Sequence, residues 1–137
     1  MGLVLDSGVL IAAERDAKPV SELLAALEQQ HGETEIVLSS ITVIELEHGF
    51  HRANTGELAR KRRDYLNTIF AAIPVEPLTR EIAQLAAKID AQAKQAGSVI
   101  PFPDLLIGTT ALYFNYVVGT RNLRHFQMIP GVNVIQL

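Results

Sequence analysis

The chain contains no cysteine, which excludes disulfide bonds and thiolate metal sites. No apolar run reaches the roughly 18 residues that a membrane-spanning helix needs. The N-terminus lacks the basic region that precedes the apolar stretch of a secretory signal, and Asp6 stands where a myristoylation signal has Ser or Thr. Together these absences predict a cytoplasmic protein that does not associate with membranes.

Charge is also scarce. Charged residues make up 20% of the 137 residues and hydrophobic residues 48%, which is typical of a globular chain and not of a disordered one. The net charge of −3 gives no overall attraction to nucleic acid, so a polyanion would need a local basic patch or a bound cation. The length fits one domain, residues 1–137, and no repeat or linker divides it.

Short apolar runs alternate with segments of helical periodicity. Strands are predicted at 3–5, 35–38, 116–119 and 132–135, with a very short one near 74–77. Helices are predicted at 9–13, 20–31, 41–50, 57–72 and 80–96, and again from Asp104 onwards. This alternation predicts an α/β fold with a short, mostly parallel central sheet flanked by helices.

The segment 105–119 carries no charged residue, which predicts a helix buried on all sides. Asp104 stands at its start behind Pro103, a residue that suits a helix start. An ionised carboxylate there needs a partner, because burying it unpaired costs several kcal/mol. Two partners are possible: the free N–H groups of the helix, where an Asp cap contributes about 1 kcal/mol, or a metal ion.

Other polar side chains are expected near Asp104. Asp6 directly follows the first strand, and the turn at 120–122 follows the strand at 116–119. Ligands of open parallel sheets bind beyond the carboxyl ends of the strands, which predicts a shared cleft lined by Asp6, Glu45, Asp104 and Asn122. Three carboxylates in one cleft raise one another's pKa, and a divalent cation relieves that repulsion.

Glu45 also has a simpler interpretation. Thr42 and Glu45 match the S/T-x-x-E capping box, in which the Glu side chain bonds back to the helix entry. Against this, Ile44 and Leu46 flank Glu45, which places its carboxylate near the edge of the core. The sequence leaves both interpretations open.

The predicted ligands are all oxygen atoms, which favours a hard cation. His48 and His51 do not form the H-E-x-x-H pattern of zinc sites and are interpreted as ordinary histidines. Mg²⁺ prefers oxygen ligands, and carboxylate-held Mg²⁺ with open positions is typical of phosphodiester hydrolysis. The basic cluster at 60–63 is either a solvated helix face or a contact to an RNA backbone or a partner.

Four segments resemble, in order, the motifs of PIN-domain ribonucleases, and most closely those of the VapC-type toxins of bacterial toxin–antitoxin pairs. They are LDSGVLI (5–11), TVIELEHG (42–49), DLLIGTTA (104–111) and TRNLRHF (120–126). The resemblance implies a three-layer α/β/α fold, RNA cleavage, homodimers, and a small antitoxin that blocks the cleft. It also implies Mg²⁺ or Mn²⁺ held by Asp6 and Asp104, with Glu45 orienting water or helping to bind the metal.

The last motif departs from the family. Many members have a further acid there, whereas this chain offers Asn122 and His125, which puts a second metal ion in doubt. Asn122 either supports water or substrate or is only a turn residue. Candidate substrate contacts are Ser7, Thr120, Arg121 and Arg124, although the two hydroxyls also suit caps or turns.

The sequence also allows two rival functions. In the first, the chain is a catalytically impaired PIN-like module that binds RNA or protein, and its acids are only helix caps. In the second, Asp6 is the nucleophile of a phosphatase of the haloacid dehalogenase type. The second is disfavoured because Gly8 stands where such an enzyme would have its second Asp.

Overall fold

The computed structural model describes all 137 residues and contains a five-stranded sheet. Its strands are β1 (Gly2–Leu5), β2 (Glu35–Ser39), β3 (Val75–Glu76), β4 (Val117–Thr120) and β5 (Asn133–Gln136). Every neighbouring pair is parallel, and the order across the sheet is β3-β2-β1-β4-β5. The sheet was predicted to be mostly parallel and is parallel throughout. Because the order reverses between β1 and β4, that position is the topological switch point, where open α/β sheets bind ligands.

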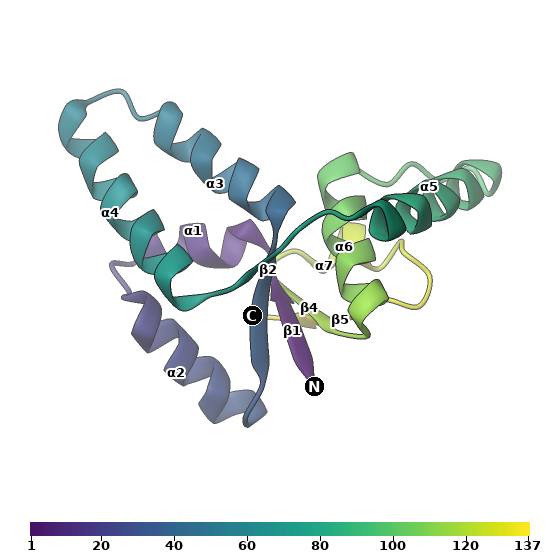
Figure 1. The fold of residues 1–137 in the computed structure, drawn as a ribbon, viewed down its shortest axis with the longest axis horizontal. Helices are drawn as coiled ribbons and strands as arrows, with labels where there is room; N and C mark the ends of the chain where they lie inside the picture. The colour runs from purple at the N-terminus through teal and green to yellow at the C-terminus, as the bar shows by residue number, and fades with distance from the viewer.

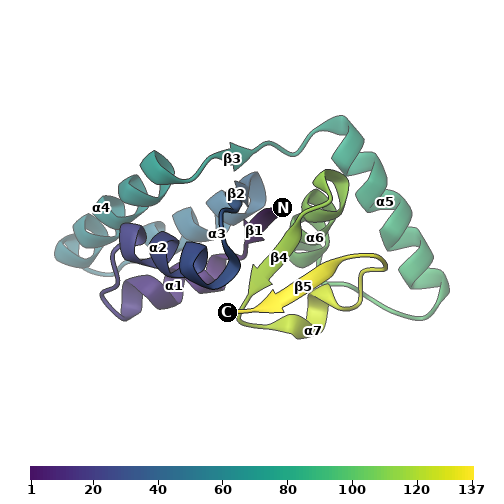
Figure 2. The same ribbon diagram turned by 90° about the horizontal axis from the view of Figure 1, so that it is seen from below.

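Seven helices cover the two faces of the sheet. They are α1 (Ser7–Arg15), α2 (Val20–His31), α3 (Ser40–His51), α4 (Gly56–Ala72), α5 (Arg80–Gln95), α6 (Phe102–Phe114) and α7 (Leu123–Phe126). Helices α1 to α4 lie on one side of the sheet and α5 to α7 on the other (Figures 1 and 2). The predicted three-layer α/β/α architecture is therefore confirmed. No helix is long and apolar enough to cross a membrane.

The core has two parts, one on each face of the sheet. Leu3 and Leu5 of β1 belong to the cluster formed with α1 to α4, whereas Val4 between them belongs to the cluster formed with α5 to α7. This alternation follows from the two-residue period of a strand. Since both faces are buried, β1 is apolar along its whole length, as expected of a central parallel strand.

Helix α6 is the most deeply buried helix, and each of its residues from Leu105 to Ala111 is buried. It begins at Phe102, two residues before the predicted start, because Pro103 fits within its first turn. Gly108 allows a close approach: a Cβ atom at this position would overlap the side chain of Ile129, which follows α7. The packing around Gly108 thus holds the segment that contains α7 against α6.

Candidate active site

Asp6 lies at the switch point between β1 and β4. Its backbone N–H donates a 2.9 Å hydrogen bond to the Gly119 carbonyl of β4. Its side chain caps α1, because Oδ1 accepts a 2.9 Å hydrogen bond from the Ser7 N–H. Asp6 is therefore held in place by both its backbone and its side chain.

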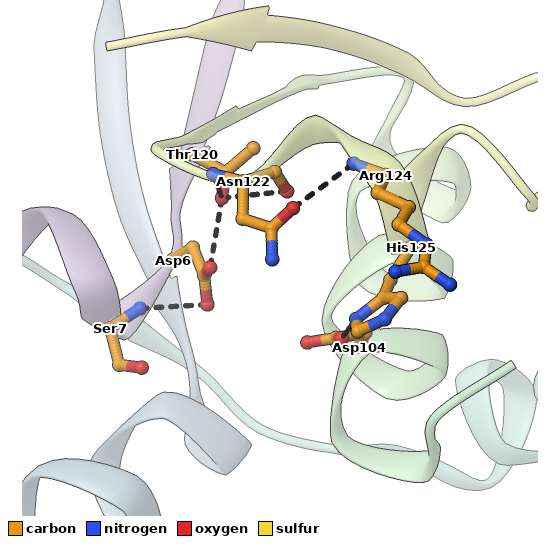
Figure 3. A network of polar contacts seen from close by, with 7 residues as sticks. All are labelled: Asp6, Ser7, Asp104, Thr120, Asn122, Arg124 and His125. Carbon is orange, nitrogen blue, oxygen red and sulfur yellow. Dashed lines mark hydrogen bonds and ion pairs between the residues drawn. The ribbon is translucent and has the colours of Figure 1, made fainter.

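Thr120 fixes the other oxygen of Asp6. The Thr120 hydroxyl donates a 2.9 Å hydrogen bond to Asp6 Oδ2 and accepts one of 3.0 Å from the Asn122 N–H (Figure 3). Thr120 belongs to β4 and is fully buried. The sequence allowed Thr120 either a substrate contact or a turn bond, and the structure shows the turn bond, because the buried hydroxyl is bonded to Asp6 and Asn122. Its contact positions a carboxylate instead.

Asp104 lies in the first turn of α6, but it is not the cap of that helix. The cap position is Pro101, and no side chain caps the N-terminus of α6. The partner of Asp104 is His125 of α7, whose Nδ1 lies 2.7 Å from Asp104 Oδ2 (Figure 3). The interpretation of Asp104 as a helix cap is therefore wrong, and its observed partner is a side chain that the sequence did not connect to it.

Glu45 lies in the middle of α3 and does not form a capping box. Helix α3 is capped by Ser39, whose hydroxyl accepts a 3.1 Å hydrogen bond from the Ile41 N–H. Thr42 is thus a buried helical residue and not a cap, so the capping-box interpretation is wrong. The Glu45 Oε1 atom is buried and has no hydrogen-bond partner. A buried acceptor without a partner is costly and rare, so this oxygen is available to accept a hydrogen bond or to contact a cation.

The three carboxylates affect one another electrostatically. Burial raises the pKa of Asp6, and the charge of Asp104 raises it further, although the hydrogen bonds from Thr120 and Ser7 counteract part of the rise. Burial also raises the pKa of Glu45, as do the charges of Asp6 and Asp104, while the nearby Ser7 hydroxyl lowers it. The charges of three separate elements therefore meet beyond the sheet edge.

The carboxylates are not arranged as a closed metal-binding cluster. The structure contains no group of three or more acidic or histidine side chains placed to hold one metal ion together. Each of the two aspartates already has one oxygen or both bound by a neighbouring residue. The assignment of Asp6, Glu45 and Asp104 as joint ligands therefore stays a prediction.

Asn122 is the cap of α7. Its Oδ1 accepts a 3.3 Å hydrogen bond from the Arg124 N–H, which leaves its amide nitrogen as the remaining polar atom. This nitrogen points toward the space between Asp6 and Asp104 (Figure 3). An amide NH₂ only donates hydrogen bonds, so Asn122 is suited to a water or phosphate oxygen and not to a metal ion.

The basic residues singled out in the sequence fall into two groups, one exposed and one paired within the fold. Arg121 and Arg124 are exposed in the segment that follows Thr120, as a substrate contact requires. In the basic cluster of α4, Arg62 donates to the Gly49 carbonyl and Arg63 pairs with Glu47 through two hydrogen bonds. These two arginines therefore join α4 to α3 and are not a free basic face.

A groove lies between α1, α3 and α6, with Glu45 in its lining. It has a volume of about 540 Å³, and its lining includes Ser7 and Glu45, with Ile44 and Phe102 among its apolar residues. Ile44 and Phe102 are themselves exposed, at 51% and 66% of their surface. His48 and Arg52 add polar groups to the same groove. Glu45 thus faces a hollow with partly apolar walls, whereas Asp6 and Asp104 do not line it.

Comparison with known proteins gives a consistent result. The PIN domain model matches residues 3–130. The "VapC ribonuclease Y4jK" of Sinorhizobium fredii is 30% identical over 139 residues, spanning 97% of this chain and 95% of the relative. The "Ribonuclease VapC" of Rickettsia bellii is 27% identical over 135 residues, spanning 98% of this chain and 96% of the relative.

Solved structures agree on the fold. VapBC2 from Rickettsia felis, crystallised with a DNA fragment from its promoter, has a TM-score of 0.86 at 21% identity and covers 100% of this chain and 99% of its own. FitAcB from Neisseria gonorrhoeae has a TM-score of 0.76 at 26% identity and covers 97% of this chain and 96% of its own. On these grounds the chain belongs to the PIN domain family, among its VapC-type proteins.

Proposed function

We propose that this chain is a metal-dependent endoribonuclease and the toxin of a toxin–antitoxin pair. The relatives that match nearly the whole chain are named as VapC ribonucleases. The observation that carries the proposal is the set of three carboxylates at the switch point, those of Asp6, Glu45 and Asp104. The pKa values of Asp6 and Glu45 are raised, and Glu45 also has a buried oxygen that lacks a partner.

The donor chemistry of these residues suits a hard divalent cation, although no three of them are arranged to hold one ion together. Every candidate ligand is a carboxylate oxygen, the donor type that Mg²⁺ and Mn²⁺ take. Asp6 and Asp104 would hold the ion, and Glu45 Oε1 would face it directly or through a water. The ion would polarise the scissile phosphate and lower the pKa of the attacking water.

The remaining residues have complementary tasks. Glu45 is the proposed acceptor for the proton of the attacking water, because its Oε1 has no hydrogen-bond partner within the protein. The Asn122 amide nitrogen donates to a nonbridging phosphate oxygen. Arg121 and Arg124 attract the RNA backbone, since they are exposed on the same turn. Thr120 keeps Asp6 oriented toward the cleft.

A small antitoxin is the proposed partner, and it would act by covering the groove beside Glu45. VapBC-5 from Mycobacterium tuberculosis, a structure of similar fold, is described as a member of the VapBC family of toxin–antitoxin systems. The apolar walls of the groove, including exposed Ile44 and Phe102, suit a protein segment. A homodimer of the chain also remains a prediction.

The test is cleavage of single-stranded RNA by the purified chain in Mn²⁺, with EDTA as one arm. Wild type should cleave only with metal. Asp104→Asn should lose about 10²-fold or more of the activity, as expected when a charge-stabilising group is removed. The matched control is Asp64→Asn on α4, an exposed acid remote from the site, which should cleave like wild type. Full activity in EDTA, or an active Asp104→Asn, would contradict the proposal.

One observation favours a second candidate, a binding module without catalytic activity. The acids do not form a closed cluster, and Asp6 does cap a helix. Such a module would bind RNA or protein without any response to metal. The two candidates are separated by whether Mn²⁺ raises the melting temperature of the wild-type chain, because only a ligand that binds the folded state does so.

A further inference from the structure

His125 makes a short contact with Asp104 at the candidate active site. The distance from His125 Nδ1 to Asp104 Oδ2 is 2.7 Å, and the two side chains are only 32% and 19% exposed. An ionised carboxylate is solely an acceptor, so Nδ1 is the donor. The contact joins α7 to α6 across 21 residues of sequence.

The fold holds the imidazole in this place from several directions. Helix α7 is a single turn whose start is fixed by the Asn122 side chain. The next residue, Phe126, is 1% exposed and packs into the core against α6 near Gly108. Gly108 lies one helical turn after Asp104, so the packing that seats Phe126 also sets His125 beside the carboxylate.

The contact leaves Asp104 partly free. His125 occupies Oδ2, whereas Oδ1 has no hydrogen-bond partner and points toward the side on which Asp6 lies (Figure 3). A carboxylate with one oxygen bound by a fixed donor loses rotational freedom. Such neighbours of a metal ligand typically change metal affinity by about 10–100-fold.

We propose that His125 is a positioning residue for Asp104: its Nδ1–H fixes the carboxylate so that Oδ1 faces the cation site shared with Asp6. This inference rests on the proposed function, because it requires that Asp104 bind a metal ion. His125 itself is not a ligand here, and it acts through the hydrogen bond alone.

The test compares Mn²⁺ affinities, measured by calorimetry without RNA, for substitutions that keep or remove the donor. His125→Leu should weaken Mn²⁺ binding by about 10–100-fold. His125→Asn should restore most of the affinity, because its amide nitrogen is as far from the backbone as Nδ1 of histidine. His125→Gln should restore little, because its amide lies one bond farther out, near the position of Nε2. His51→Leu removes an exposed histidine of α3 and serves as the matched control.

The outcomes are distinct. Wild-type affinity in both His125→Leu and His125→Gln would overturn the positioning role and leave the proposed function intact. A restored affinity in His125→Gln but not in His125→Asn would also overturn it, because the imidazole would then act through Nε2. No Mn²⁺ binding by wild type would overturn both proposals. If His125→Leu fails to fold, as judged by its melting temperature, the Asn and Gln variants still decide the question.

Discussion

The Thr120 hydroxyl at the end of β4 donates a 2.9 Å hydrogen bond to Asp6 at the end of β1, 114 residues earlier in the chain. This bond crosses the switch point of the sheet. It orients the carboxylate and lowers the pKa of Asp6 against the rise caused by burial.

Thr120→Val therefore removes a donor without changing the shape of the side chain. We expect it to destabilise the fold by about 1 kcal/mol, because a buried acceptor loses its partner, and to weaken Mn²⁺ binding by about 10-fold or more. Urea unfolding and calorimetry measure the two effects. Thr120→Ser keeps the hydroxyl and should stay close to wild type, and equal behaviour of Val and wild type would refute the role of this bond.

Glu45→Gln should stabilise the metal-free protein at neutral and higher pH. The pKa of the Glu45 carboxyl group is higher in the folded state than its usual 4.5, so the folded protein becomes less stable as the pH rises and this group ionises. The neutral amide of the variant does not ionise and causes no such loss. The melting temperature of the variant relative to wild type should therefore increase as the pH rises above the usual pKa of 4.5 and level off once Glu45 is ionised in the folded wild type.

The same substitution provides its own control with metal. Mn²⁺ should raise the melting temperature of wild type more than that of Glu45→Gln, because the variant lacks the charge that the cation neutralises. A variant that is less stable than wild type across the whole pH range would show that the Glu45 charge is already satisfied within the fold.

Arg121→Ala and Arg124→Ala, made together, should weaken RNA binding and leave Mn²⁺ affinity unchanged. For every phosphate that the double variant no longer neutralises, the slope of log affinity against log salt should fall by roughly 0.7 for a single strand. Fluorescence anisotropy at several salt concentrations gives both the RNA affinity and its salt slope. For this measurement the arginine substitutions are made in the Asp104→Asn variant, so that the RNA is not cleaved. A double variant with an unchanged salt slope would place the RNA elsewhere on the surface.

Arg63→Leu should affect stability and not metal binding. Arg63 pairs with Glu47, lowers the pKa of that carboxyl group and lies 4.2 Å from the centre of the Phe50 ring. The substitution should reduce the melting temperature, and this loss should fade in acid as Glu47 becomes protonated. A change in Mn²⁺ affinity would contradict the purely structural role assigned to this pair.

The alternation of strands and helices was predictable because each element has a clear period in the sequence. Helix α6 was instead predicted from its lack of charge, and its residues from Leu105 to Ala111 are buried, whereas Tyr113 near its end is 48% exposed. The position of Asp6 was predictable for the same reason, because it ends an apolar run. The all-parallel pairing and the strand order were not predictable, since they depend on which crossover covers which face of the sheet.

The contacts that orient the acids could not be predicted from local patterns. The bond between His125 and Asp104 depends on close packing at Gly108, and no periodicity encodes a contact across the core. The capping-box interpretation of Thr42 was wrong because Ser39, three residues earlier, already caps the helix. The burial of Thr120 was missed because the strand extends one residue farther than its apolar run.

The proposed chemistry requires that Asp6 and Asp104, with Glu45 beside them, share one divalent cation. A crystal structure of the chain soaked in Mn²⁺, with anomalous diffraction data, tests this most directly. We expect an anomalous peak at about 2.0–2.3 Å from an oxygen of each aspartate, with Glu45 Oε1 facing the ion directly or through a water. A peak only at another acidic site, or no peak while the protein cleaves RNA, would contradict it.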